Sequence, residues 1–450
     1  MFDPRRISMS GTKRAVAVAI TVTSTLMLAA CGSTPSTTSS TASNTESVAS
    51  SPASGATGSA EVFSSWTSGS ESAALQSLFD TTKSANPSLE LVNAAVAGGA
   101  GVNSKQVLTD RLAAGDVPET WKTTLGSELS NYVKQGVVAD LTDLYASEGW
   151  DKVVPKELID NMSYDGKTYA ALTGVHRANV LWYNKPLVED AGVTVPATLT
   201  FADFATIATQ LQGKGITPLC LGDKDTWTAA QLLEAIIVGE IGAQGWTGLT
   251  DGTLSWTDSK VVQAVTDFST ALTWTNKDHK SLDWTGAVSS LADGKCAFNL
   301  MGDWAYGELT TNLNKVDGTD FGYTVIGDPN TFVTVSDAFV EGVGSKNPAG
   351  AVAFLKALMT PEGQIAFNKL KGSAPVRSDV ELSRLGVYQQ GAATTLAQGV
   401  KVASLVHGEA PVPAADSQAL ADNVALLEAN GNAAAFSAAM DKAFKANAGS

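Results

Sequence analysis

Hydrophobic and polar positions along the chain switch repeatedly between the spacing of a strand and the spacing of a helix. Residues 61–63 alternate as a strand does, and residues 70–83 follow with apolar side chains at helical spacing. Residues 89–92 return to a strand pattern, and residues 104–114 return to a helical one. Strands that alternate with helices predict a largely parallel sheet with helices on both faces.

The same order of patterns recurs in the second half of the chain. Helical periodicity and strand patterns predict helices at 201–212, 228–239, 259–273, 347–359, 361–370 and from Ser417 onward, and strands at 216–221 and 296–301. Two α/β lobes accommodate these elements better than one very wide sheet. We therefore expect an α/β fold with more than one lobe.

The beginning of the chain has a different pattern. Basic residues up to Arg14 precede an uncharged apolar run at 15–30, which is typical of a secretion signal and too short for a comfortable membrane span. The ending Leu-Ala-Ala-Cys at Cys31 resembles the lipobox of bacterial lipoproteins, which are cleaved before the cysteine and acylated on it. This resemblance implies a signal peptide at 1–30 and a lipid anchor on Cys31. A secreted protein with a free Cys31, or an uncleaved anchor, is the alternative, and a start at Met9 would leave the signal intact.

The segment after Cys31 has the composition of a flexible tether. Between residues 32 and 60 only Asn44, Glu46 and Val48 fall outside Ser, Thr, Ala, Gly and Pro. Such a segment cannot bury enough apolar surface to offset the entropy of ordering it. We expect residues 31–60 to be a disordered tether that holds a folded domain near a membrane.

The net charge of the chain limits the classes of partner that it can bind, and its cysteines allow one disulfide in the mature domain. The formal net charge is −15, from 30 basic and 45 acidic residues, which repels phosphate backbones and argues against a nucleic-acid partner. Cys220 and Cys296 lie in apolar runs, and in an exported protein they can form a disulfide. The alternative is a pair of buried thiols.

Sequence motifs for catalysis and metal binding are missing. There is no CxxC, HExxH or G-x-S-x-G motif, and His176, His279 and His407 lie far apart along the chain. Asp223 and Asp225 in GDKDTW favour a turn over the carboxylate pair of a glycosidase, and we expect His279 to be solvated. We therefore expect no catalytic residues, no metal and no cofactor. A secreted glycoside hydrolase is kept as a rival hypothesis.

Several motifs, taken together, carry a family resemblance. They include EVFSSWTSGSESAAL, DRLAAGDVPETW, DGKTYAALTGVHRANVLWYNK, PLCLGDKDTWTAAQL, AFNLMGDWAYGEL, FLKALMTPEGQIAFNKLKGSAPVR and SLVHGE. They resemble the extracellular solute-binding proteins of ABC sugar importers, and most of all the glucose/mannose-binding branch. The likeness runs over nearly all of residues 61–450, with many motifs in the same order and spacing.

The resemblance implies a fold and a role. The fold is the two-lobed one of periplasmic binding proteins, with a hinge between lobe 1 (61–173 and 332–377) and lobe 2 (174–331 and 378–450). The role is a monomeric receptor, lipid-anchored on the outer face of the bacterial cytoplasmic membrane. It captures a monosaccharide, a glucose-like hexose first of all, and delivers it to ABC permease subunits without any covalent step.

The resemblance also implies a binding site. A pyranose offers apolar faces to aromatic rings and hydroxyl groups to directional hydrogen bonds, and the chain has ten Trp. Trp66 is expected to stack on the sugar, so that Trp66→Ala weakens binding with little change in melting temperature. The other ligand contacts implied are Glu71, Lys122, Thr124, Asp303, Trp304, Asp337, Lys371 and His407, and His176 and Trp227 are either ligand contacts or hinge residues.

Each of these residues also has an ordinary structural explanation. Glu71 suits the first turn of any helix, Lys371 could be a solvated surface residue, and His407 could be a hydrogen-bonded core histidine. The sequence departs from the branch at Ser65, where relatives often have a second Trp, and at Lys122 and Thr124, which replace an amide and a histidine. These departures leave open another hexose or a pentose, and a disaccharide or a polyol is a further alternative. Other rivals are a peptide- or polyamine-binding protein, which Lys122, Lys371 and His407 disfavour, and a lipoprotein scaffold without a small ligand.

Overall fold

A computed structural model describes residues 55–97, 101–196 and 198–447. The predicted signal peptide at 1–30, the predicted anchor Cys31 and the tether as far as residue 54 lie outside the described residues. Within the described ranges, no helix combines the length and the apolar character needed to cross a membrane.

The first sheet has six strands in the order β12-β11-β3-β1-β2, with β6 paired to the long central strand β11. β1 runs parallel to both β2 and β3, whereas β11 runs antiparallel to β3 and β6 and parallel to β12. The strands span Gly58–Phe63 (β1), Leu89–Asn93 (β2), Thr120–Thr124 (β3), Ala171–Arg177 (β6), Thr331–Glu341 (β11) and Val400–Ala403 (β12).

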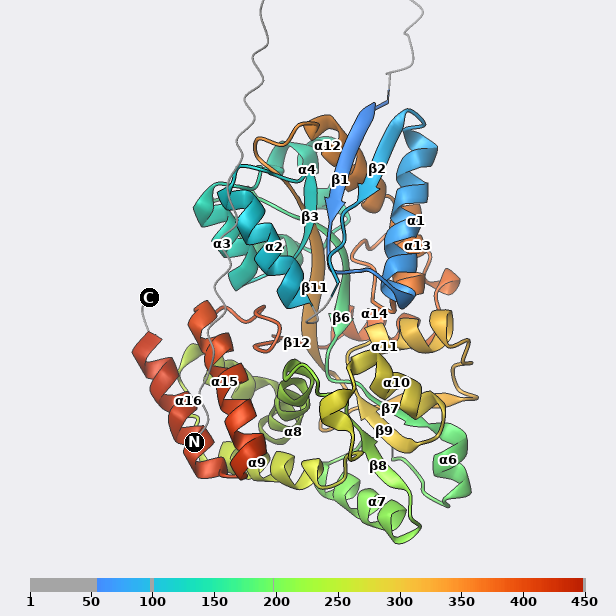
Figure 1. Cartoon of the computed structure of the whole chain (residues 1–450), viewed down its shortest axis with the longest axis vertical. Coiled ribbons are helices and arrows are strands. Elements are labelled where there is room, and N and C mark those ends of the chain that lie inside the picture. The colour runs from blue at the N-terminus through green and yellow to red at the C-terminus, as the bar shows by residue number, and fades with distance from the viewer. Residues whose placement is uncertain (1–54, 98–100, 197, 448–450) are drawn as a thin grey trace, which may run out of the picture. The chain divides into compact units, whose positions relative to one another are not determined.

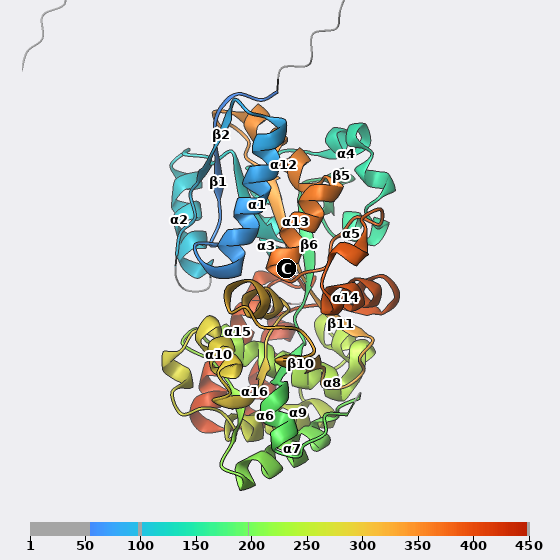
Figure 2. The ribbon, with the colours of Figure 1, turned by 90° about the vertical axis from the view of Figure 1, so that its right-hand side faces the viewer.

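Helices cover both faces of this sheet. In Figures 1 and 2, α1 and α2 lie on opposite sides of β1 and β2, and α12 and α13 lie beside α1. The packing is apolar, as where Phe79 of α1 meets Phe354 of α12 with ring centroids 6.1 Å apart. The helices span Gly69–Ala85 (α1), Val102–Ala113 (α2), Ser127–Gln135 (α3), Thr142–Glu148 (α4), Lys156–Asp160 (α5), Pro348–Leu358 (α12), Pro361–Lys371 (α13) and Val387–Gln398 (α14).

The second sheet has four strands in the order β10-β7-β9-β8. β8 is parallel to β9, and β7 is antiparallel to both β9 and β10. The strands span Leu181–Asn184 (β7), Thr217–Cys220 (β8), Cys296–Leu300 (β9) and Phe321–Thr324 (β10). The last residue of β8, Cys220, forms a disulfide with Cys296, the first residue of β9.

Local sequence explains where two helices around the second sheet begin or are interrupted. Thr200 and Asp203 form a capping box at the start of α7, and Gly242 interrupts α8 with a φ of +69°. The helices span Lys185–Asp190 (α6), Phe201–Gly213 (α7), Trp227–Asp251 (α8), Ser259–Leu272 (α9), Trp284–Ala292 (α10), Trp304–Gly307 (α11), Ala414–Asn430 (α15) and Ala433–Asn447 (α16).

The chain passes from the first sheet to the second between β6 and β7, and it returns between β10 and β11. β12 comes from the segment that the resemblance assigns to lobe 2, yet it pairs with β11 in the first sheet. The helices and strands predicted from periodicity are present, but the prediction of a largely parallel sheet was wrong. Both sheets are mixed, because β7 runs antiparallel to β9 and β10, and β11 runs antiparallel to β3 and β6.

Candidate functional site

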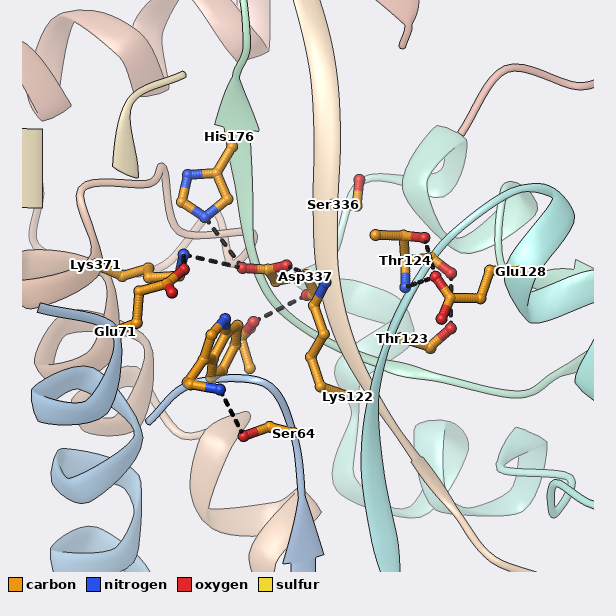
Figure 3. Close-up of polar contacts among 12 residues, drawn as sticks. Ser64, Glu71, Lys122, Thr123, Thr124, Glu128, His176, Ser336, Asp337 and Lys371 are labelled. Carbon is orange, nitrogen blue, oxygen red and sulfur yellow. Dashed lines mark hydrogen bonds and ion pairs between the residues drawn. The ribbon is translucent and has the colours of Figure 1, made fainter. Parts of the chain in front are cut away.

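Ionisable side chains from both sheets meet in a mostly buried group near the β6–β7 passage (Figure 3). They come from α1, β3, β6 and β11, from the end of α13, and from the residue that precedes α11. We call this group the charged cluster; its members are Glu71, Lys122, His176, Asp303, Asp337 and Lys371.

Asp337 of β11 is the centre of the charged cluster. Its Oδ1 lies 3.1 Å from Lys122 Nζ, and its Oδ2 lies 3.1 Å from His176 Nε2 and 3.7 Å from Lys371 Nζ. Burial by itself raises the pKa of the Asp337 carboxyl, but the Lys122 and Lys371 ammonium groups outweigh it and hold that pKa far below its usual range. Asp337 is therefore a carboxylate throughout the physiological range.

His176 of β6 lies between two carboxylates. Its Nδ1 is in direct contact with Asp303 Oδ1, and its Nε2 faces Asp337 Oδ2. Burial lowers the pKa of the imidazole, but the Asp303 and Asp337 carboxylates together outweigh burial, so the net shift is upward. Since both ring nitrogens face acceptors, both carry protons, and His176 is an imidazolium ion.

Asp303 is the member of the charged cluster that comes from the second sheet. It follows β9 and precedes α11, and its side chain is fully buried. Its Oδ2 accepts hydrogen bonds from the Arg177 backbone N–H at 3.0 Å and from the Tyr388 hydroxyl at 3.2 Å. The contact between Asp303 and His176 therefore joins the two sheets through a charged hydrogen bond.

Lys371, the last residue of α13, lies close to two indole rings. Its Nζ is 2.6 Å from Glu71 Oε1, 5.1 Å from the ring centroid of Trp66 and 6.0 Å from that of Trp304. A cation within about 6 Å of an aromatic face is attracted by the ring. Lys371 is therefore a buried cation with an acidic partner and aromatic neighbours, and the interpretation as a solvated surface lysine was wrong.

Trp66 is more deeply buried than a free stacking platform would be. Only 2% of it is exposed, and its ring packs against Phe339 and Phe367 with centroids 5.8 Å and 5.5 Å away. Replacing a buried Trp with Ala typically costs about 3–5 kcal/mol of stability. The expectation that Trp66→Ala leaves the melting temperature nearly unchanged does not fit this burial, and Trp66→Phe is the better test.

Trp227, Trp304 and His407 form an aromatic group beside the charged cluster. The His407 ring lies 5.5 Å from Trp227 and 5.4 Å from Trp304, and Trp304 lies 5.3 Å from His176. Gln231 donates from Nε2 to the Ala178 carbonyl at 2.8 Å, so its Oε1 accepts from His407 Nε2 at 3.0 Å.

The protonation of His407 is opposite to that of His176. Burial, and then the Lys122 charge, lower the pKa of His407 to about 3, so its imidazole is neutral. The residue keeps partial contact with solvent. The site therefore contains one neutral histidine, His407, and one protonated histidine, His176.

Thr124 is the predicted site residue that lies beside the charged cluster rather than within it. Its hydroxyl donates to Glu128 Oε2 at 2.6 Å (Figure 3). Glu128 also pairs with Lys105 at 3.1 Å. Thr124 is opposite Asp337 in the β3–β11 pairing, so it remains close to the cluster.

Three neighbouring residues were not predicted. Gln231 is four residues after Trp227 in α8 and therefore on the same helix face, which is a signal that could have found it. Glu308 lies in the same motif as Asp303, and its Oε2 is 3.4 Å from the Ser70 backbone N–H at the start of α1. Tyr388 had no sequence signal, because it reaches Asp303 from a distant helix.

The charged cluster is electrically balanced and holds donors and acceptors in fixed directions. Lys122, Lys371 and the protonated His176 offset the carboxylates of Glu71, Asp303 and Asp337. Glu71 and Lys122 keep 24% and 20% of their side chains exposed, so a ligand can reach both an acceptor and a donor. Balanced charges and adjacent indole rings suit an uncharged ligand with many hydroxyl groups.

Comparison with known proteins is consistent with this arrangement. The sequence profile of the bacterial extracellular solute-binding proteins matches residues 66–365. The chain is 31% identical, over 82% of its length and 89% of the relative, to a Rhizobium meliloti protein named "Probable sugar-binding periplasmic protein". It is 30% identical, over 78% of its length and 79% of the relative, to an uncharacterised ABC transporter extracellular-binding protein of Pyrococcus horikoshii.

A solved structure shows the same fold. A chitin oligosaccharide binding protein superimposes with a TM-score of 0.75 at 21% identity, covering 87% of this chain and 100% of that one. The predicted α/β fold of the two-lobed binding-protein type is thereby confirmed. The matching family and the Rhizobium meliloti relative are named for solute and sugar binding, which confirms the prediction that the chain is a binding protein and not an enzyme. The chain belongs to the bacterial extracellular solute-binding proteins.

Proposed function

We propose that the chain is the sugar-binding receptor of an ABC importer, and that the charged cluster and its indole rings bind the sugar. The observation that carries this proposal is the pairing of buried, balanced charges with the Trp66 and Trp304 rings, both within about 6 Å of the Lys371 ammonium. Ionised groups strengthen hydrogen bonds to hydroxyls, and indole faces cover the apolar faces of a sugar ring.

The balance of charge supports a neutral ligand over a charged one. A polyamine needs an excess of carboxylates, whereas here Lys371 and Lys122 already bind the Glu71 and Asp337 oxygens. A peptide carboxylate would meet Asp337 and Glu71 in addition to the lysines. A hydroxyl group can insert between an ammonium and a carboxylate and bond to both.

The names of similar proteins also support a carbohydrate. The Rhizobium meliloti relative is named for sugar binding, and the structural neighbour is named for a chitin oligosaccharide. Within this class we propose a glucose-like hexose, from the resemblance of the motifs around Trp66 and Asp303. A pentose, a disaccharide, a longer oligosaccharide or a polyol is the alternative outcome, because Ser65, Lys122 and Thr124 depart from the glucose/mannose-binding branch.

We propose that sugar binding is coupled to movement of the two sheets. The contact between His176 and Asp303 joins the two sheets, so a change in the relative position of the sheets changes the charged cluster. A ligand that contacts both sheets shifts the equilibrium between open and closed arrangements toward closure. The same proposal includes the lobe boundaries, the anchor at Cys31, the monomeric state and docking of the closed form on permease subunits.

The first test is a thermal-shift screen of the purified protein against mono-, di- and oligosaccharides, polyols, polyamines and short peptides. A ligand that binds only the native state raises the melting temperature. We expect at least one saccharide to raise it by about 2 °C or more, with no shift from spermidine or tripeptides. A shift from polyamines or peptides alone would contradict the proposal. Release of reducing sugar from glycosides would instead support the glycoside hydrolase hypothesis.

A further inference from the structure

A second group of polar side chains lies outside the charged cluster, beside the helices at the end of the chain. Asp223 follows β8, His279 and Lys280 begin the short 3₁₀ segment His279–Ser281, and Glu428 lies near the end of α15. The group borders a cavity of about 360 Å³, whose lining is Ser269, Leu272, Thr273, His279, Lys280, Leu427, Glu428 and Gly431.

Three of these side chains present metal-ligating atoms to one another. One carboxylate oxygen each of Asp223 and Glu428 and one ring nitrogen of His279 lie within 4.8 Å of one another. The backbone supports the arrangement, because the Asp223 N–H donates to the His279 carbonyl at 2.7 Å. The Thr228 hydroxyl holds the other carboxylate oxygen of Asp223 at 3.2 Å.

Two of the ligating residues have buried polar atoms without a partner. The Glu428 side chain is only 4% exposed, and its Oε1 has no hydrogen-bond partner. The Nδ1 of His279 is also buried without a hydrogen bond, and it lies 3.9 Å from Asp223 Oδ2. The His279 side chain keeps 21% of its surface exposed, so it is partly rather than fully solvated. Buried polar atoms of this kind normally have partners, so their convergence points to a ligand.

Lys280 is the group that neutralises the carboxylates in this structure. Its Nζ contacts Asp223 Oδ2 and lies 2.7 Å from Glu428 Oε2. One ammonium therefore serves the carboxyl groups of both residues. The Lys280 side chain is 55% exposed, so it can turn into solvent and leave the carboxylates to another cation.

We propose that Asp223, His279 and Glu428 form a binding site for a divalent transition-metal ion, with zinc as the reference ion. Two carboxylate oxygens and one imidazole nitrogen are a donor set that zinc accepts, and three protein ligands leave a position for water. The cavity beside Glu428 provides room for that water. The ion would join the loop after β8, the segment at His279 and α15, and would thereby fasten the terminal helices to the second sheet.

The test is calorimetric titration of the purified full chain, freed of metal with a chelator, with zinc chloride. We expect one strong site and a rise in melting temperature of about 3 °C or more at saturating zinc. His279→Ala and Glu428→Gln should each weaken zinc binding about tenfold or more. Glu189→Gln is the matched control, because Glu189 makes an exposed 3.9 Å pair with Lys185, and it should leave zinc binding unchanged.

Lys280→Met distinguishes a metal site from a simple ion pair. At a metal site, removal of the competing ammonium should raise the zinc affinity about tenfold. If the group is only an ion pair, Lys280→Met lowers the melting temperature and brings no zinc binding. Absence of saturable zinc binding by the wild type, or binding that neither His279→Ala nor Glu428→Gln weakens, overturns the proposal. None of these readouts depends on sugar binding.

Discussion

Lys371 is the residue on which the proposed binding site depends most. Its ammonium group is buried, paired with Glu71 at 2.6 Å, close to Asp337 at 3.7 Å and placed over the Trp66 ring. A buried charge is stable only while its partners remain, so the loss of one member of such a group costs more than the loss of an exposed pair.

Lys371→Met should lower the free energy of unfolding by about 3–5 kcal/mol, because Asp337 and Glu71 lose a buried partner. Urea denaturation followed by circular dichroism measures it. The control is Lys156→Met, because Lys156 pairs with Asp160 on the surface and its side chain is 84% exposed. The control should stay close to wild type. Equal effects of the two substitutions would show that Lys371 is not a buried ion-pair member.

His407 should make the protein sensitive to acid. Its pKa in the folded protein is about 3, below the value near 6.5 in an unfolded chain, so the unfolded state takes up the proton first. The free energy of unfolding should therefore fall as the pH falls below about 6.5. Because His407 keeps some contact with solvent, we expect a loss of about 1–2 kcal/mol between pH 7 and pH 4.5.

The pH dependence is measured by urea denaturation of wild type and His407→Asn in the same buffers. Other groups titrate equally in both proteins, so the difference between the two curves isolates His407. The variant should lose less stability on acidification. Parallel curves would mean that His407 is protonated in the folded protein at mildly acidic pH.

At the residue scale, the sequence predicted the members of the site better than their contacts. Glu71 and Lys371 were both implied by the family resemblance, but their ion pair joins positions 300 residues apart. Periodicity and spacing describe near neighbours only, so they could not predict this pair. The resemblance placed Thr124 at the ligand, and its hydroxyl donates to Glu128, four residues later.

At the scale of elements, α13 positions the site through the turn that ends it. Gly372 caps this helix with a φ of +100°, and its Cα packs so closely on Asp303 that an added Cβ would overlap the Asp303 carbonyl oxygen. A glycine is required there for backbone conformation and for space alike. This turn sets Lys371 beside Glu71 and brings α13 against the segment that follows β9.

Gly372→Ala should therefore cost more than an alanine at an uncrowded helix end. Gly136 caps α3 with a φ of +68°, and nothing lies within 4 Å of an added Cβ. We expect Gly136→Ala to lower the free energy of unfolding by about 1 kcal/mol and Gly372→Ala by more than about 3 kcal/mol. Urea denaturation of both variants checks this difference. Equal costs would mean that Asp303 does not crowd Gly372.

Helices were easier to predict than strands because one face of each helix is buried and the opposite face is exposed. The helices α1 and α7 bury one side only, so their apolar positions repeat at helical spacing. The strands β6 and β11 are buried along almost their whole lengths, so they show no alternation to detect. The antiparallel direction of β11 depends on where a distant segment re-enters the sheet, which local sequence does not record.

At the scale of the whole molecule, the charged cluster connects two sheets that the chain links by only a few passages. His176 comes from the first sheet and Asp303 follows a strand of the second, and their contact couples the two. A receptor that closes on its ligand needs such a junction, because binding energy must be transmitted between lobes. The proposed zinc site lies elsewhere in the fold and would act on stability alone.

The most direct test of the proposed function is calorimetric titration of wild type, Glu71→Gln and the control Glu189→Gln with the saccharide that gives the largest thermal shift. We expect wild type and Glu189→Gln to bind one sugar per chain with a dissociation constant of about 10 μM or lower, and Glu71→Gln to bind at least about tenfold more weakly. Absence of heat with every saccharide, or equal affinity of Glu71→Gln and wild type, would contradict a sugar site at the charged cluster.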